Sequence, residues 1–383
     1  MDSSSPLPPP VALGAGVVRR DSRLADGRDL FYYDDPDTGL PPERALDERA
    51  LPPRPETATM RQDVLTGDWI TFASARQNRV LMPSANADPL APQSATNPSE
   101  VPSRYDVAVF ENRSPSFGPA AGDAPGAPGG LDELAAIALD RALGSVGRCE
   151  VVCFSPEATG SFGTQTVVRA RTVIEAWADR TAALSAIPGV EQVFPFENRG
   201  EAIGVSLPHP HGQIYAYPYI TPRTGRLLDA VRRTSDDLLE RVLASEQASS
   251  RVVLQGEHWT AFVPFAARWP LEVQLMPHRH VPDLAALTDA ERDELAPLYL
   301  RLLRGVDALY DTPTPYIAAW HQAPVHVGRD TVRMRLELTS PRRAADKLKY
   351  LAGSEAAMSA WTAEILPEDA AERLRAAIEK VPA

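Results

Sequence analysis

The sequence has little cysteine, no excess of positive charge and no long apolar run. Its two cysteines, Cys149 and Cys153, stand four residues apart in an apolar segment. On a strand they would share one face and lie too far apart to form a disulfide. We interpret them as reduced core residues of a cytoplasmic protein, because disulfides are rare in the cytosol. Two cysteines alone are also too few for a zinc site.

The charge balance and the hydropathy pattern exclude further classes. A formal net charge of -12 argues against nucleic acid or an anionic membrane as a partner, because both require a basic surface. No apolar run approaches the length that crosses a bilayer. The residue Asp2 stands where a signal peptide carries positive charge. A small anionic substrate remains possible, provided that local arginines overcome the global charge.

Proline marks two segments that depart from regular structure. Prolines crowd residues 6–55, where charge is mixed and periodicity is weak. Residues 1–59 are therefore predicted to form a mostly extended arm, with order beginning near Met60. A second cluster of proline and glycine, at residues 115–130, predicts a surface loop.

Apolar periodicity predicts the regular elements. Helices are expected at residues 173–187, 226–244, 289–309 and 368–380. Thr288 and Glu291 form a capping box at the start of the third helix. Runs rich in valine, phenylalanine and tyrosine predict strands at residues 106–111, 150–155, 189–196, 259–264 and 272–276.

The order of these elements repeats along the chain. Residues 105–117, 149–158, a helix and 197–217 are followed in the same order by 259–269, 271–280, a helix and 319–339. Two fused halves are predicted, with residues 60–250 as the catalytic half and residues 251–383 as the second half. Only the first half carries the pair His209 and His211. Arg333 and Arg335 stand at the corresponding places of the second half.

The histidine pair is the strongest chemical signal. It lies in the segment Pro-His-Pro-His-Gly-Gln at residues 208–213. On extended backbone His209 and His211 point to the same side. A neutral imidazole attacks phosphorus without first losing a proton, so His211 is a candidate nucleophile. Taken alone, such a pair is more often a metal-ligand pair or a polar strand face, and the surrounding motifs must decide.

The surrounding motifs favour catalysis. Residues 196–218, FENRGEAIGVSLPHPHGQIYAYP, resemble the active-site segment of the galactose-1-phosphate uridylyltransferase family, which belongs to the histidine-triad superfamily. Further matching blocks follow the family's order at residues 65–69, 109–112, 153–156, 319–324 and 347–355. The agreement of several independent motifs makes the resemblance specific over most of the chain.

The resemblance implies a fold and a reaction. The fold class is α+β, with two fused histidine-triad-like halves, a mainly antiparallel sheet that forms an open half-barrel, and helices packed outside. The reaction is the exchange of UMP between a nucleotide sugar, UDP-sugar, and a sugar 1-phosphate, by a ping-pong mechanism through nucleotidyl-His211. The family also forms homodimers. Two alternatives stay open: a phosphorylase or hydrolase of nucleotide sugars or dinucleotides, and a catalytically inactive nucleotide-binding paralogue.

Carried over residue by residue, the resemblance assigns three groups of site residues. His211 becomes uridylylated. The nucleotide and its phosphates would be held by Arg76, Arg79, Asn112, Asn198, Gly204, Ser206 and Gln213. The sugar phosphate would meet Lys349, Glu355 and Trp361. A solvated face is the commoner role of an Arg-x-x-Arg spacing, but guanidinium groups match the geometry of phosphate.

The sequence departs from the family at its metal sites. The positions of the structural zinc ligands hold Asp88, Ala91, Ala158 and His209, of which only His209 is a usual ligand. We therefore expect no zinc there and no cofactor. His209 is interpreted as a remnant that positions His211 through its backbone carbonyl.

A second family metal site is also incomplete. His321 is a remnant position, whereas Arg335 and Glu337 stand where the family has histidines. Either Arg335 replaces the charge of the metal by pairing with Glu337 or another carboxylate, or this half has drifted. At the sugar end, Trp361 replaces a glutamine and Ser354 a tyrosine, so galactose is not assured as the sugar.

Overall fold

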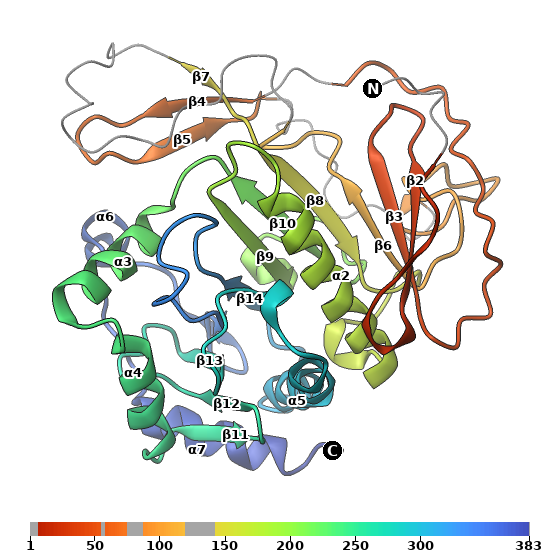
Figure 1. Cartoon of the computed structure of the whole chain (residues 1–383). Helices are drawn as coiled ribbons and strands as arrows, with labels where there is room; N and C mark the ends of the chain where they lie inside the picture. Colours follow the sequence, from red (N-terminus) through yellow and green to blue (C-terminus); the bar gives the residue numbers. More distant parts are fainter. Residues whose placement is uncertain (1–6, 55–57, 75–86, 119–141, 383) are drawn as a thin grey trace.

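The computed structural model describes residues 7–54, 58–74, 87–118 and 142–382 (Figure 1). Its centre is a twelve-stranded antiparallel sheet with the order β1-β2-β3-β6-β8-β10-β9-β14-β15-β13-β12-β11. These strands are β1 (Val11–Ala12), β2 (Val18–Arg23), β3 (Asp29–Asp34), β6 (Val107–Glu111), β8 (Arg148–Cys153), β9 (Gln192–Arg199), β10 (His211–Tyr217), β11 (Val252–Gln255), β12 (Trp259–Phe262), β13 (Leu271–Pro277), β14 (Tyr316–His321) and β15 (Arg335–Ser340).

Two smaller sheets and six α-helices complete the described structure. The small sheets contain β4 (Thr59–Gln62), β5 (Trp69–Phe72) and β7 (Leu143–Gly144), and β16 (Arg342–Ala344) and β17 (Lys347–Leu348). The helices are α2 (Val167–Ser185), α3 (Pro222–Thr234), α4 (Leu238–Gln247), α5 (Asp289–Asp307), α6 (Gly353–Met358) and α7 (Pro367–Ile378). None of these helices is long and apolar enough to cross a membrane. The α+β fold class is confirmed.

All four predicted helices are present, but α2 begins at Val167 rather than at residue 173, and one predicted helix is divided. The capping box of Thr288 and Glu291 starts α5 as expected. The single helix predicted at residues 226–244 is instead two helices, α3 and α4, because Ser235 adopts an extended conformation. The polar run around Ser235 explains the break, since short polar side chains compete with the helix for backbone hydrogen bonds.

The sheet order reflects the predicted repeat. In the first half the strands run β6-β8-β10-β9, and in the second half β12-β13-β15-β14. The two series meet where β9 pairs with β14. Across the single sheet, the strands of the second half therefore appear in the reverse of the order found in the first half. The boundaries at residues 60, 250 and 251 remain a prediction.

The expected N-terminal arm is wrong for residues 11–34. These residues form β1, β2 and β3, and β3 pairs with β6 at the edge of the catalytic half. The tyrosines Tyr32 and Tyr33 are fully buried on opposite faces of β3. The apolar run of β3 is short and flanked by proline-rich sequence, which concealed the strand. Residues 35–54 contain no helix or strand.

Helices α2 and α5 lie on one face of the large sheet, and the candidate site lies on the other face. On one face, α2 and α5 pack against alternate strand residues such as Val109, Val152 and Ile214 (Figure 1). The alternate neighbours Phe110 and Val151 point to the other face, because successive residues of a strand face opposite sides. That second face carries the chemistry described next.

Candidate active site

The first residue of β10 is His211, and the strand register determines its neighbours. His211 lies opposite Cys153 of β8. On the other side Gln213 pairs with Phe196 of β9, so the same register brings Asn198 opposite His211. His211 and Gln213 therefore project from the sheet face that α2 and α5 leave uncovered.

A hydrogen bond determines the tautomer of His211. The ring atom Nδ1 lies 2.7 Å from the backbone oxygen of His209, and a carbonyl oxygen can only accept. Nδ1 therefore carries hydrogen, and in the neutral ring Nε2 carries the lone pair. The carbonyl of His209 thus positions the His211 ring as expected, and Nε2 is the ring atom with a lone pair.

A cavity of about 450 Å³ opens beside this ring. Four predicted site residues line it, namely Asn112, Ser206, His211 and Gln213. Apolar side chains of Leu90, Phe110, Val151 and Leu207 form much of its wall, and Arg28, Glu100 and Arg113 add charge. An apolar hollow with a few convergent polar groups is typical of a small-molecule site.

Gly212 lies close to core groups on the side of the sheet away from His211. A Cβ at this position would lie 2.8 Å from Cζ of Phe154 and 3.0 Å from the carbonyl oxygen of Phe196. Both contacts are on the helix-covered side of the sheet. The glycine makes room for core packing directly behind the nucleophile.

The neighbour His209 is buried, with 2% of its surface exposed, and forms a pair with Asp88. Its Nδ1 lies 2.7 Å from Oδ2 of Asp88, and its Nε2 lies 2.8 Å from the backbone oxygen of Ser155. Burial opposes the charge of Asp88, but the hydrogen bond and charge of His209, together with the backbone hydrogen bonds of Leu90 and Ala91, lower the pKa of this carboxyl. Both ring nitrogens thus lie within hydrogen-bonding distance of protein acceptors, one of which is the Asp88 carboxylate.

These residues do not fit the zinc of the family. Both ring nitrogens of His209 already bind protein oxygens, and a metal would have to displace one of them. Ala91 and Ala158 offer no ligand atoms. Across the described ranges, no group of three or more histidine, cysteine, aspartate or glutamate residues is placed to hold a metal ion. A closed structural zinc site requires four ligands.

The second family metal position holds a different ion pair from the one considered above. Arg223, at the start of α3, donates to Glu337 at 2.6 Å, whereas Arg335 lies opposite His321 in the sheet. Burial, followed by the charges of Arg335 and Arg223, lowers the pKa of His321 well below its usual range. The cation paired with Glu337 is thus Arg223 and not Arg335.

The other predicted nucleotide-binding residues either do not line the cavity or lie outside the described residues. Asn198 and Gly204 are not among the described residues that line it. Gly204 ends the 3-10 turn Glu201–Ile203 with a φ of 82°, a left-handed conformation that favours glycine. Arg76 and Arg79 fall in residues 75–86, outside the described ranges.

The predicted sugar-phosphate residues gather in a separate place. Lys349 pairs with Glu355 at 2.7 Å and lies 5.9 Å from the centre of the Trp361 ring. The hydrogen bond from Lys349 lowers the pKa of Glu355 to about 2. None of the three lines the His211 cavity as far as the structure is described. Lys349 instead lines a second hollow with Ile203.

Sequence reasoning missed three charged residues of the cavity wall, Arg28, Glu100 and Arg113. Arg28 belongs to the turn between β2 and β3, inside the segment that was expected to be an arm. Arg113 directly follows the predicted Asn112, and the need for charge beside a nucleotide was the available signal. Glu100 had no sequence signal, because its place depends on the loop that packs Pro89 and Leu90 against the cavity.

Comparisons with known proteins show one family over most of the chain. Family models of the galactose-1-phosphate uridyl transferase match twice, the N-terminal domain over residues 53–221 and the C-terminal domain over residues 229–381. A galactose-1-phosphate uridylyltransferase from Streptomyces lividans is 43% identical over 375 residues, covering 94% of this chain and 98% of that protein. One from Thermotoga maritima is 34% identical and covers 82% of this chain and 97% of its own length.

Solved structures show the same fold. A uridylyltransferase structure superposes with a TM-score of 0.73 at 30% identity, covering 85% of this chain and 100% of that one. An ADP-glucose phosphorylase from Arabidopsis thaliana has a TM-score of 0.61 at 20% identity, covering 85% of this chain and 99% of that one, a likeness that concerns the fold alone. The models match both halves and the relatives are similar over nearly their whole lengths, so the chain belongs to the galactose-1-phosphate uridyl transferase family.

Proposed function

We propose that this protein transfers UMP between a UDP-sugar and a sugar 1-phosphate, with His211 as the carrier. The curated relatives named above are galactose-1-phosphate uridylyltransferases, which supports this activity and the galactose pathway. The single observation that supports the carrier is the hydrogen bond from Nδ1 of His211 to the His209 carbonyl. This hydrogen bond leaves the lone pair on Nε2, the ring nitrogen that points away from the backbone. The ring can therefore attack phosphorus without first losing a proton.

In the first half-reaction Nε2 of His211 attacks the α-phosphorus of the UDP-sugar. The P–N bond forms as the P–O bond to the sugar phosphate breaks, and the sugar 1-phosphate leaves with the electron pair. Nδ1 keeps its hydrogen throughout and donates to His209, so the positive charge that develops on the ring faces a carbonyl dipole. Ser206 and Gln213 line the same cavity and provide hydrogen-bond donors for phosphate oxygens.

In the second half-reaction a phosphate oxygen of another sugar 1-phosphate attacks the uridylyl phosphorus. The P–N bond breaks and its electron pair returns to Nε2. Both steps use the same nucleophile, so the enzyme is restored and no nucleoside triphosphate is consumed. This chain's residues provide the nucleophile, its orientation and the phosphate donors.

Intact-protein mass spectrometry tests the carrier. Incubation with UDP-glucose is expected to add one uridylyl group and release glucose 1-phosphate. His211→Asn keeps a polar side chain of similar size and is expected to form no adduct. His280→Asn serves as the control, because His280 binds the backbone of Arg329 and does not line the cavity. An adduct that persists in His211→Asn would refute the assignment.

The acceptor separates this function from the alternatives. The purified adduct is expected to transfer UMP to galactose 1-phosphate much faster than to inorganic phosphate or water. Faster transfer to phosphate would identify a phosphorylase, and faster transfer to water a hydrolase. Failure to form an adduct with any nucleotide sugar would indicate a nucleotide-binding protein without activity.

We also propose a homodimer in which the C-terminal block completes the site of the partner. The predicted sugar-phosphate residues Lys349, Glu355 and Trp361 lie outside the His211 cavity as described, although the reaction needs a place for the acceptor. The same block exposes apolar side chains, with Tyr350 80% and Met358 77% exposed. Exposed apolar surface of this kind commonly marks an interface. We place the protein in the cytoplasm, consistent with its free and buried cysteines.

Complementation between subunits tests this arrangement. His211→Asn and Lys349→Met are expected to be inactive alone. After unfolding and refolding together, mixed dimers would contain one intact site, and activity would return to about a quarter of the wild-type value. Without recovery in a sample that light scattering shows to be dimeric, Lys349 would serve its own chain.

A further inference from the structure

One wall of the active-site cavity comes from a turn outside the matched family models. Arg28 lies between β2 and β3, whereas the N-terminal model begins at residue 53. Its side chain is completely buried, and each part of its guanidinium group has a protein acceptor. Nε donates to Asp26 at 2.8 Å and Nη1 to the backbone oxygen of Glu111 at 2.8 Å, while Nη2 lies 2.5 Å from Oε2 of Glu100. Arg28 is therefore rigidly held.

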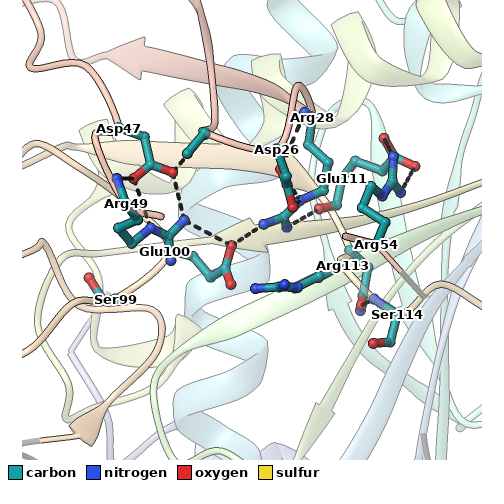
Figure 2. A network of polar contacts seen from close by, with 12 residues as sticks. Asp26, Arg28, Asp47, Arg49, Arg54, Ser99, Glu100, Glu111, Arg113 and Ser114 are labelled. Atoms are coloured by element: carbon teal, nitrogen blue, oxygen red, sulfur yellow. Dashed lines mark hydrogen bonds and ion pairs between the residues drawn. The ribbon is translucent and has the colours of Figure 1, made fainter. Parts of the chain in front are cut away.

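Glu100 is fixed through one of its two carboxylate oxygens. Oε2 accepts from Arg28, and Nη2 of Arg49 lies 3.5 Å from the same oxygen (Figure 2). Among the described residues no donor reaches Oε1. The Glu100 side chain is 18% exposed and lines the cavity. Within the described part of the chain, Oε1 is thus an acceptor without a donor on a side chain that lines the cavity.

The position of this acceptor relative to His211 follows from the sheet order. The hairpin with Arg28 adjoins β6, and β6 and β8 separate it from β10. Phe110 of β6 and Val151 of β8 pair with each other across this distance and present apolar surface to the cavity. A planar nucleobase suits that apolar wall when its phosphate lies at His211.

A second charged group faces the same end of the cavity. Arg113 follows Asn112 and extends toward Glu100 in Figure 2. Its Nη2 donates to the backbone oxygen of Pro52 at 2.9 Å, and Arg113 forms no ion pair within the described chain. The far end of the cavity therefore presents a carboxylate acceptor beside guanidinium donors. Uracil has the complementary edge, with the N3 hydrogen between two carbonyl oxygens.

We propose that Glu100, positioned by Arg28, recognises the base of the nucleotide by accepting the N3 hydrogen of uracil. This inference rests on the proposed function only in taking the cavity as a nucleotide site. Cytosine has an acceptor in place of that hydrogen and would face the carboxylate lone pairs. Glu100 is therefore a specificity residue, and Arg28 is a positioning residue that acts through it.

The substitution Glu100→Gln tests the proposal because it reverses the hydrogen-bonding character of one atom. Arg28 and Arg49 can only donate, so the amide oxygen is expected to stay with them. The amide NH2 group then faces the cavity as a donor, which suits N3 of cytosine and not N3–H of uracil. The wild type is expected to bind UMP more tightly than CMP, and Glu100→Gln to lower the ratio of affinities about ten- to a hundredfold.

Isothermal titration calorimetry with UMP and CMP measures this ratio without requiring catalysis. Glu111→Gln is the matched control, because Glu111 belongs to the same network but pairs with Arg54 and Arg148, away from the cavity lining. It is expected to keep the wild-type ratio. The ratio is measured within each variant, so a partly unfolded sample does not alter it. Arg28→Lys keeps a donor and should retain part of the preference that Arg28→Ala loses.

The outcomes separate the two proposals. An unchanged ratio in Glu100→Gln, or equal losses for UMP and CMP, would overturn recognition of the base by Glu100. A wild type that binds neither nucleotide, or CMP as tightly as UMP, would also overturn it. A wild type that prefers UMP but forms no adduct with UDP-glucose would refute the proposed transfer and leave the role of Glu100 supported.

Discussion

Replacing Asp88 by asparagine should slow the enzyme although Asp88 does not line the cavity. Asp88 accepts from Nδ1 of His209 at 2.7 Å, and the carbonyl of His209 accepts from Nδ1 of His211 at 2.7 Å. Asparagine has nearly the same shape and keeps one acceptor oxygen. It removes the negative charge that the His209 ring faces. The nucleophile would lose the rigid support behind it.

The magnitudes follow from the kind of bond that is weakened. A charge-assisted hydrogen bond that becomes neutral should cost about 1–2 kcal/mol of stability. A displacement of the His211 ring by part of an ångström should slow its attack about ten- to a hundredfold. Ala87 and Pro89 line the cavity, but Asp88 between them does not. Since Asp88 does not face the substrate, KM for the UDP-sugar should change little.

Rapid-quench measurement of adduct formation gives the rate of attack directly. Asp179→Asn is the matched control, since Asp179 is a largely buried carboxylate that pairs with Arg19 at 2.8 Å and accepts from Tyr33 far from the site. It should lose stability in urea unfolding without slowing the adduct. If Asp88→Asn lost stability equally but formed the adduct at the wild-type rate, the pair would be structural only, and the reasoning would be refuted.

Two further variants test the packing around the site. Burial raises the pKa of Glu197 to about 8, so the folded state keeps a proton that the unfolded chain releases, and stability should fall as pH rises from 4.5 toward about 8. Glu197→Gln should flatten this dependence in urea unfolding at several pH values, and an unchanged slope would contradict it. Gly212→Ala should cost about 1–3 kcal/mol, because its Cβ would meet Phe154 and Phe196. An unchanged unfolding midpoint would show that the backbone adapts.

Local patterns predicted much of the fold because they report on short-range physics. The periodicity around residues 289–309 and the capping box at Thr288 determine α5 almost alone. The repeated order of strands and helices likewise predicted two joined halves. The strand β3 was missed because its apolar run is short and is stabilised by pairing with β6, which is distant in sequence.

The site was predictable where one segment carries it. His211, Ser206 and Gln213 come from a single motif, and the structure brings them to one cavity with Asn112. The charged wall was not predictable, because Arg28 and Glu100 meet only after the N-terminal hairpin joins the sheet. The pairing of Glu337 with Arg223 also depends on where α3 begins relative to β15.

The attachment atom of the adduct tests the central claim most directly. The protein labelled with 15N at histidine is loaded with UDP-glucose, digested, and studied by tandem mass spectrometry and by phosphorus–nitrogen correlation in NMR. The account predicts one uridylyl group on His211, bonded through Nε2, because Nδ1 carries the hydrogen that His209 accepts. Attachment through Nδ1, or to any other residue, would contradict it.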